Sequence, residues 1–93
     1  MKKAEVNRKT FLYDEENKTV YYVILMTNHM EAENRDWQER FHEDLWDDIF
    51  VYEGIRYAGV TSTTLSKDKW DDEEAREEFI SEWMLEKGLL LSY

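Results

Sequence analysis

The chain has 93 residues, a formal net charge of −10 and no cysteine. This length fits one domain, residues 1–93, and a hydrophobic content of 42% suffices for a folded core. The absence of cysteine excludes disulfides and thiolate metal sites and fits a reducing compartment. No apolar run approaches the roughly 18 residues of a membrane span, and the basic N-terminus lacks the apolar stretch of a signal peptide. We therefore expect a cytoplasmic protein.

The negative charge is distributed unevenly along the chain. Residues 1–30 hold four acids against five bases, whereas residues 31–93 hold 18 acids against seven bases. An excess of this size repels nucleic acids and membrane surfaces and attracts basic partners. The sequence therefore argues against direct binding to nucleic acids or membranes.

The first predicted element is a β-hairpin over residues 10–28. Two runs rich in Thr, Val, Tyr and Phe flank a polar break at 15–18, which is typical of strands joined by a turn. The second run is apolar on both faces, with Val20 and Tyr22 on one and Tyr21 and Val23 on the other. This pattern predicts a central or covered strand.

The next predicted element is a helix over residues 31–48. Trp37, Phe41, Leu45 and Ile49 recur every four residues and form one apolar stripe, which predicts that these side chains are in the core. Asn34 is the candidate N-cap. The acids between them lie on the opposite side of this helix.

The remainder of the chain predicts strands followed by a second helix. Residues 49–65 form either a hairpin or one long strand, with a turn at Gly54 and a bulge or close approach at Gly59. Residues 67–87 predict a helix that Ser66 or Asp68 caps and Gly88 ends. Its apolar side comprises Ala75, Phe79, Ile80, Trp83 and Met84.

These elements together predict an α+β fold. We expect one antiparallel β-sheet of three to five strands, with two amphipathic acidic helices packed on it. The apolar segment 89–93 is compatible with a last strand or with docking on a partner subunit, and the four tryptophans are many for a small interior. A homodimer is therefore one of the alternatives that the sequence leaves open.

Catalytic and metal-binding motifs are not recognisable in the sequence. His29 and His42 lack the spacing of a metalloprotease motif, and the run from Asp68 to Glu74 lacks the glycine at the sixth position that an EF-hand loop requires. We expect neither an enzyme nor a bound cofactor. A deep pocket containing either histidine would support the alternative of a small enzyme or ligand-binding domain.

Dense carboxylates are the feature that points to function. Residues 31–48 carry eight acids, about one per 3.4 Å of helix, which is close to the axial charge spacing of one DNA strand. Residues 68–86 carry nine more. We predict that these two acidic faces, with Trp46 and Trp70 as apolar anchors, bind a partner. The candidate contacts are Asp36, Glu39, Glu43, Asp44, Trp46, Asp47, Asp48, Trp70, Asp71, Glu74, Glu77, Glu78 and Glu82.

The runs FHEDLWDDIF and DKWDDEEAREEF, the small size and the lack of cysteine resemble the small acidic DNA-mimic proteins of bacteriophages. The resemblance implies a non-catalytic inhibitor that serves host takeover by binding the DNA-binding surface of a host protein. The implied partner is a basic nucleic-acid-binding protein, such as a histone-like nucleoid protein, a CRISPR effector, a restriction enzyme or RNA polymerase. It also implies a location in the host cytoplasm. The alternative is a protein–protein interaction module that regulates a host enzyme through exposed aromatics.

Overall fold

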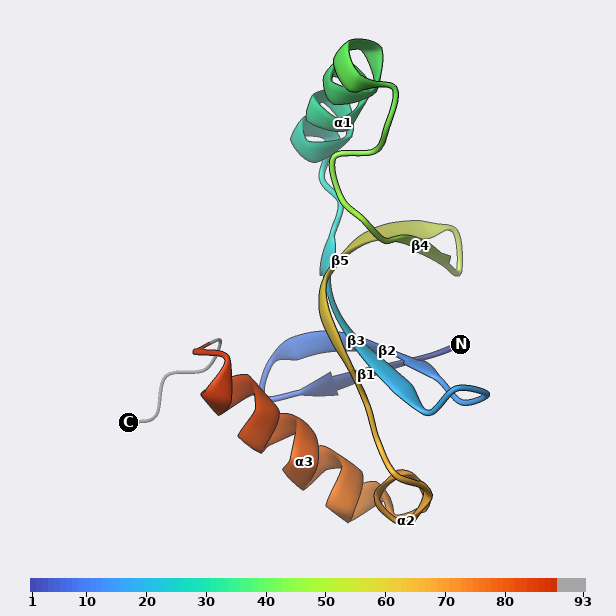
Figure 1. The fold of residues 1–93 in the computed structure, drawn as a ribbon, viewed down its shortest axis with the longest axis vertical. Coiled ribbons are helices and arrows are strands. Elements are labelled where there is room, and N and C mark those ends of the chain that lie inside the picture. The colour runs from blue at the N-terminus through green and yellow to red at the C-terminus, as the bar shows by residue number, and fades with distance from the viewer. Residues whose placement is uncertain (89–93) are drawn as a thin grey trace.

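Five strands form one antiparallel sheet in the order β1-β2-β3-β5-β4, and the two C-terminal helices pack on it, in a computed structural model that describes residues 1–88 (Figure 1). This arrangement confirms the predicted α+β class and antiparallel sheet. The predicted role of residues 89–93 lies outside the described residues. The strands are β1 (Lys2–Val6), β2 (Lys9–Asp14), β3 (Thr19–Leu25), β4 (Ile49–Tyr52) and β5 (Ile55–Thr64).

Tight turns connect the strands of the hairpins. The predicted hairpin of β2 and β3 is confirmed, and β4 and β5 form a second one around Glu53 and Gly54, whose φ angles are 50° and 79°. Two consecutive positive φ angles match the right-handed twist of paired strands. β1 was not predicted from the sequence; it pairs with β2 through a similar turn at Asn7 and Arg8.

Gly59 lies at an irregularity in the pairing of β3 with β5. Tyr22 is opposite Thr61, but Val23 is opposite Gly59, so the register shifts between these two pairs. A Cβ atom on Gly59 would lie only 2.9 Å from the Cβ of Asp48. The predicted close approach at this glycine is therefore confirmed, and only glycine fits here without a shift of the chain before β4.

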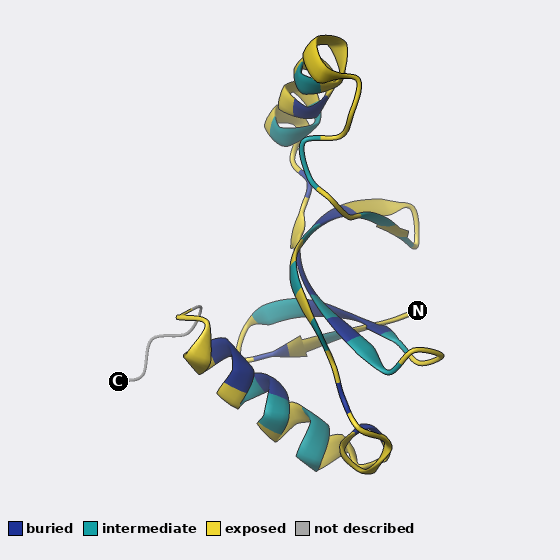
Figure 2. Cartoon of the chain, viewed as in Figure 1, coloured by how far each residue is buried: buried dark blue, intermediate teal, exposed yellow. Residues whose placement is uncertain are grey.

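The sheet has a hydrophobic cluster on each of its faces. Figure 2 shows buried residues along the central strands and along α3. On one face, Val20 and Tyr22 of β3 join the larger cluster with residues of the C-terminal helices. On the other face, Val23 belongs to a smaller cluster against which Tyr21 and β4 aromatics pack. As predicted, β3 is apolar on both faces, and it lies at the centre of the sheet.

The C-terminal helices cover the larger cluster. The predicted helix over 67–87 is two helices, α2 (Lys67–Asp71) and α3 (Glu73–Glu86), because the chain is extended at Asp72. The Asp72 carboxylate accepts a hydrogen bond from the Glu74 amide at 3.0 Å and so caps α3. Ser66 occupies the N-cap position of α2, and Gly88 follows α3 with a φ of 70°, both as predicted.

The first helix, α1 (Asn28–Phe41), lies at the opposite end of the molecule from α3 (Figure 1). The predicted boundaries of 31 and 48 are both wrong. Thr27 is the N-cap, and His42 ends the helix in the left-handed conformation with a φ of 59°. Residues 42–48 are irregular, since the chain must turn back to enter β4 at the sheet.

Candidate functional site

The outer side of α3 carries a row of four glutamates. Ile80, Trp83 and Met84 are buried on the inner side of the helix, against the sheet. The glutamates are exposed, and their four-residue spacing separates neighbours by about 6 Å along the helix axis. We call this set the α3 ridge; its members are Glu74, Glu78, Glu82 and Glu86.

The ridge gives α3 a dense negative charge. Together with Glu73 and Glu77, six glutamates lie along a 14-residue helix of about 21 Å, or one per roughly 3.5 Å. A single DNA strand carries one charge per about 3.4 Å of axis. No glutamate of the ridge forms an ion pair with any residue from 1 to 88. Four negative groups are therefore available to a basic surface.

The one basic residue of α3 does not neutralise the ridge. The Arg76 guanidinium lies 4.8 Å from the ring centre of Tyr13 and 5.1 Å from that of Trp70, and it donates a hydrogen bond to the Trp70 carbonyl. Burial raises the pKa of the Tyr13 hydroxyl, and the positive charge of Arg76 partly opposes this rise. Arg76 thus packs against core aromatics on the inner side of the helix and is partly buried there.

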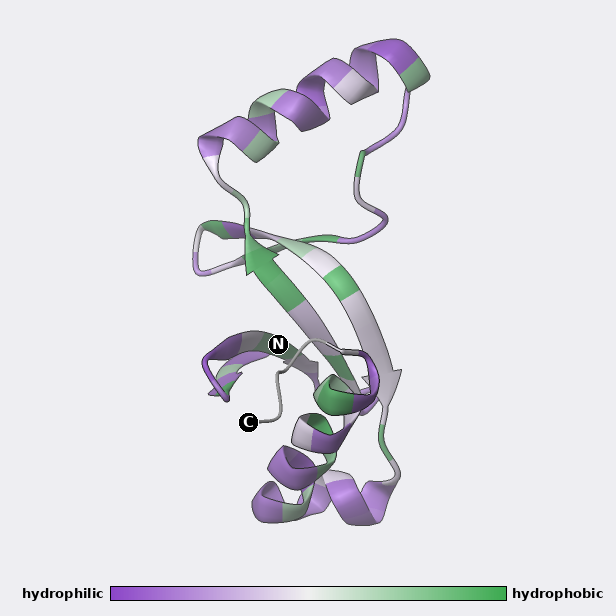
Figure 3. Cartoon of the chain, turned by 90° about the vertical axis from the view of Figure 1, so that its left-hand side faces the viewer, coloured by the Kyte–Doolittle hydropathy of each residue, from purple (hydrophilic) through white to green (hydrophobic). Residues whose placement is uncertain are grey.

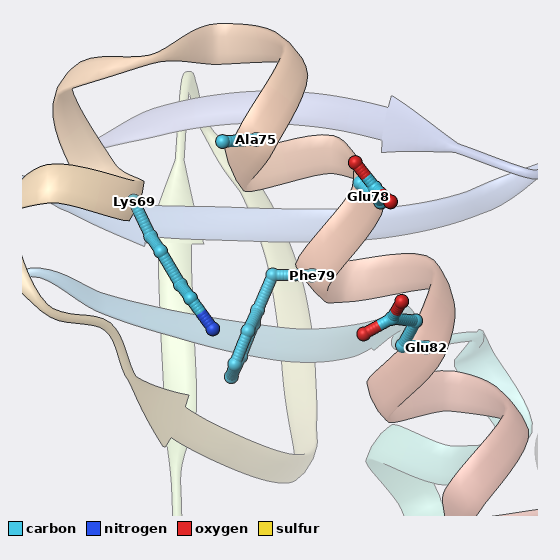
Figure 4. Close-up of a pocket in the computed structure, with 5 residues that line it drawn as sticks. All are labelled: Lys69, Ala75, Glu78, Phe79 and Glu82. Atoms are coloured by element: carbon cyan, nitrogen blue, oxygen red, sulfur yellow. The ribbon is translucent and has the colours of Figure 1, made fainter.

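An open hollow of about 230 Å³ adjoins the ridge (Figure 4). Its lining comprises Lys69, Ala75, Phe79 and two ridge residues, Glu78 and Glu82. The Lys69 ammonium lies 4.6 Å from the ring centre of Phe79. This lining holds neither histidine of the chain, so the hollow does not support the alternative of an enzyme centred on His29 or His42.

Trp70 was predicted to be an apolar anchor for a partner, but the structure buries it. Its side chain is 7% exposed and packs edge-on against Tyr13, with ring centroids 5.6 Å apart. The short helix α2 directs this ring into the larger cluster, so Trp70 stabilises the fold and is not available to a partner. The predicted contacts Asp71 and Glu77 are exposed.

The predicted acidic face over residues 31–48 does not exist as one helical surface. Asp36 and Glu39 are exposed on α1, and Asp36 pairs with Arg40 at 3.6 Å. The other predicted acids lie in the irregular segment after the helix. Of the predicted residues in that segment, Trp46 is half-buried, and the acids Glu43, Asp44, Asp47 and Asp48 are exposed.

Asp44 connects this irregular segment to α1. Its carboxylate accepts hydrogen bonds from the side-chain amides of Gln38 and Asn34. Asn34, predicted as an N-cap, is buried in mid-helix with 3% exposure, and its oxygen accepts a 2.7 Å hydrogen bond from the Leu45 amide. Asp44 and Asn34 therefore hold the chain that returns to the sheet.

An aromatic pair on α1 was predicted to be core but is largely at the surface. Phe41 is 52% exposed, and its ring centroid lies 4.3 Å from that of Trp37, which is half-buried. The four-residue spacing correctly put the two rings side by side. It did not reveal that neither hydrophobic cluster within residues 1–88 includes a residue of α1. Figure 3 shows that this helix is mostly hydrophilic.

The two sets of predicted acids lie at opposite ends of the molecule (Figure 1), so the fold does not bring them into one site.

No group of His, Asp or Glu residues among 1–88 is arranged to hold a metal ion. Within the same range, no helix is both long and apolar enough to cross a membrane. Comparison with protein-family models, with curated proteins and with solved structures finds no match to this chain.

Proposed function

We propose that the protein is a non-catalytic inhibitor that binds the DNA-binding surface of a basic host protein. The α3 ridge occupies the positions of DNA phosphates on that surface, so the inhibitor and DNA exclude each other. Lysines and arginines of the partner form ion pairs with the ridge, and no covalent bond is made or broken. The host cytoplasm is the proposed location.

The unneutralised ridge is the observation that carries this proposal. Each like-charge pair at four-residue spacing destabilises a helix by about 0.2–0.5 kcal/mol. The ridge contains three such pairs, Glu74 with Glu78, Glu78 with Glu82 and Glu82 with Glu86. The first turn of α3 benefits from acids near the helix N-terminus, but Glu82 and Glu86 lie too far along it. A basic partner would offset this repulsion on binding.

A capture experiment tests the proposal. The protein is immobilised, nuclease-treated bacterial lysate is passed over it, and bound proteins are eluted with duplex DNA and identified. The test variant is E74Q/E78Q/E82Q, which removes three ridge charges while keeping side-chain size. The matched control, E5Q/E16Q/E33Q, removes three charges at exposed positions outside α3.

Elution by DNA of a nucleic-acid-binding protein that the control captures and the ridge variant does not would support mimicry. The reason is that ion pairs to phosphate-binding residues supply most of the electrostatic affinity on such surfaces. If the captured protein is indifferent to both DNA and the ridge charges, mimicry is wrong.

The aromatic pair of α1, an exposed Phe41 beside a half-buried Trp37, favours a second candidate, a protein–protein interaction module that regulates a host enzyme. Exposed Trp and Phe rings are typical anchors at protein interfaces. In this case W37A/F41A abolishes capture, whereas E74Q/E78Q/E82Q slows association and leaves much of the affinity intact. The same capture experiment therefore separates the two candidates.

A further inference from the structure

The sheet ends in two strands, β1 and β4, that pair on one side only within residues 1–88. In a hairpin with a two-residue turn, the pair that closes the turn is hydrogen-bonded, and such pairs alternate along the strands. The closing pair of the second hairpin is Tyr52 with Ile55. The amide and carbonyl groups of Ile49 and Val51 therefore point away from β5 and are free to pair with another strand.

The same reasoning applies to β1. Val6 and Lys9 close the turn between β1 and β2, so the backbone groups of Lys3 and Glu5 point outward. Each free edge of the sheet thus offers two residues whose backbone donors and acceptors have no partner strand. Both edges therefore offer a template for strand addition.

The two edges differ in the features that prevent another strand from pairing with them. Natural sheets commonly protect a free edge with charges, with proline or with a very short strand. β1 carries outward Lys3 and Glu5, whereas β4 is short but consists of Ile-Phe-Val-Tyr, with neither charge nor proline. Val51 is 67% exposed in the middle of β4. The β4 edge is therefore open to a further strand along an apolar stretch.

The charges that flank the two edge strands are opposite in sign. Asp47 and Asp48 precede β4 and Glu53 follows it, whereas Lys3 lies early in β1 and Arg8 and Lys9 follow it. Pairing β4 with a second β4 would place acids beside acids at both ends. Pairing β4 with β1 of another copy places acids beside bases.

We propose that copies of this chain associate head to tail, with β1 of one copy added to the β4 edge of the next. An antiparallel register that places Val51 opposite Glu5 also places Lys3 opposite Glu53 and Arg8 opposite Asp48. Neither base has an ion-pair partner among residues 1–88. This register keeps the outward backbone groups of both strands in phase.

The resulting contact is small and heterologous. A head-to-tail contact generates a ring if the rotation closes and an open chain if it does not. One short strand pair buries little area, which is typical of weak and transient association. The net charge of −10 opposes association, but charges more than about 8 Å apart are largely screened at physiological ionic strength, so the pairs at the edges dominate.

Sedimentation velocity on the full chain over a concentration series tests this inference without any partner protein. The average mass rises with concentration above the 11.4 kDa of one chain. V51P removes the outward amide donor of β4 and abolishes the rise, since proline is tolerated where an edge amide faces solvent. V51A keeps that amide and retains the rise.

A charge exchange identifies the strands and does not depend on the proline variant folding. D48K/E53K reverses the two β4 charges that face β1 in this register, and K3E/R8E reverses their two partners on β1. Each variant alone stays at the mass of one chain, because its two edges now carry like charges. Mixing the two variants restores association, because the reversed β4 matches the reversed β1.

A wild-type mass that stays at one chain over the whole series would overturn the inference. Association that survives V51P in a folded protein, or that both charge variants retain alone, would also overturn it. These measurements need no DNA and leave the α3 ridge unchanged, so the inference and the proposed function can fail separately.

Discussion

α3 and α1 are both 14 residues long, yet different forces hold them in place. α3 buries three apolar side chains, Ile80, Trp83 and Met84, against the sheet. The only buried side chain of α1 is the polar Asn34. The difference teaches that α3 belongs to the cooperative core of the molecule, whereas α1 is an appendage that a few polar contacts fix.

The contacts of α1 can be named individually. The Thr27 hydroxyl caps its first turn, and Arg56 of β5 forms a 2.9 Å ion pair with Glu31. Asn34 binds the irregular segment after the helix through Leu45. Isolated helices of about this length are marginal in water. We therefore expect α1 to open locally while the sheet and α3 stay folded.

The largest expected difference in stability is between the substitution of a tryptophan on α3 and of one on α1. Trp83→Ala removes a ring that is 6% exposed, and it lowers the free energy of unfolding by about 3–5 kcal/mol. Trp37→Ala on α1 costs roughly 1 kcal/mol or less, because its ring is half-buried beside an exposed Phe41. Urea unfolding followed by far-UV circular dichroism gives both values, and similar losses for the two variants would contradict the comparison.

The next largest loss of stability concerns the buried side-chain amide of Asn34 on α1. Asn34→Ala leaves the Leu45 amide without its acceptor, which costs about 1–3 kcal/mol in the stability of α1 and its following segment. Hydrogen exchange should show lost protection at α1 amides and at Leu45, with β3 amides unchanged. A uniform loss of protection over the whole chain would show that α1 is part of the core.

The helix caps provide a matched pair of smaller effects. Asp72→Ala removes the acceptor for the Glu74 and Ala75 amides and lowers the global free energy of unfolding by about 1 kcal/mol. Thr27→Ala removes the cap of α1, which costs a similar amount that appears only as local fraying. Global unfolding and hydrogen exchange measured together distinguish these two responses. Equal shifts of the global unfolding midpoint for both variants would count against an appended α1.

The smallest effect should be a gain in stability. Glu78→Gln on α3 removes repulsion with Glu74 and Glu82, so the free energy of unfolding rises by about 0.2–0.5 kcal/mol per pair. The comparable Glu33→Gln on α1 weakens its contact with His29 and brings no such gain. Thermal unfolding at low salt, where surface charges interact most strongly, is the suitable measurement. A loss of stability in Glu78→Gln would mean that the ridge has a structural role.

The sequence by itself determined the elements whose signals are local. The β2–β3 hairpin was predictable because strand-forming runs flank a short polar break, and the β4–β5 hairpin was one of the two alternatives that the break at Gly54 indicated. The inner side of α3 was predictable because Ile80, Trp83 and Met84 recur at helical spacing. The charge density of the α3 ridge was also visible, since it depends on composition over one helix.

Only the tertiary structure decided where α1 ends and which aromatics are buried. The spacing of Trp37, Phe41, Leu45 and Ile49 fits one long helix, but pairing of β4 with β5 draws Ile49 into the sheet. The chain must then leave the helix at His42, and the side chain of Asn34 satisfies the Leu45 amide that the turn would leave unpaired.

The same dependence on distant partners explains why strand β1 and the burial of Trp70 were not predicted. β1 has little of the alternating apolar pattern of a strand, and it is ordered by pairing with β2. The density of acids around Trp70 suggested a surface anchor, but the ring is buried because Tyr13, far away in the sequence, lies against it together with Arg76 of the next helix. Burial depends on which elements meet in space, and no local pattern contains that information.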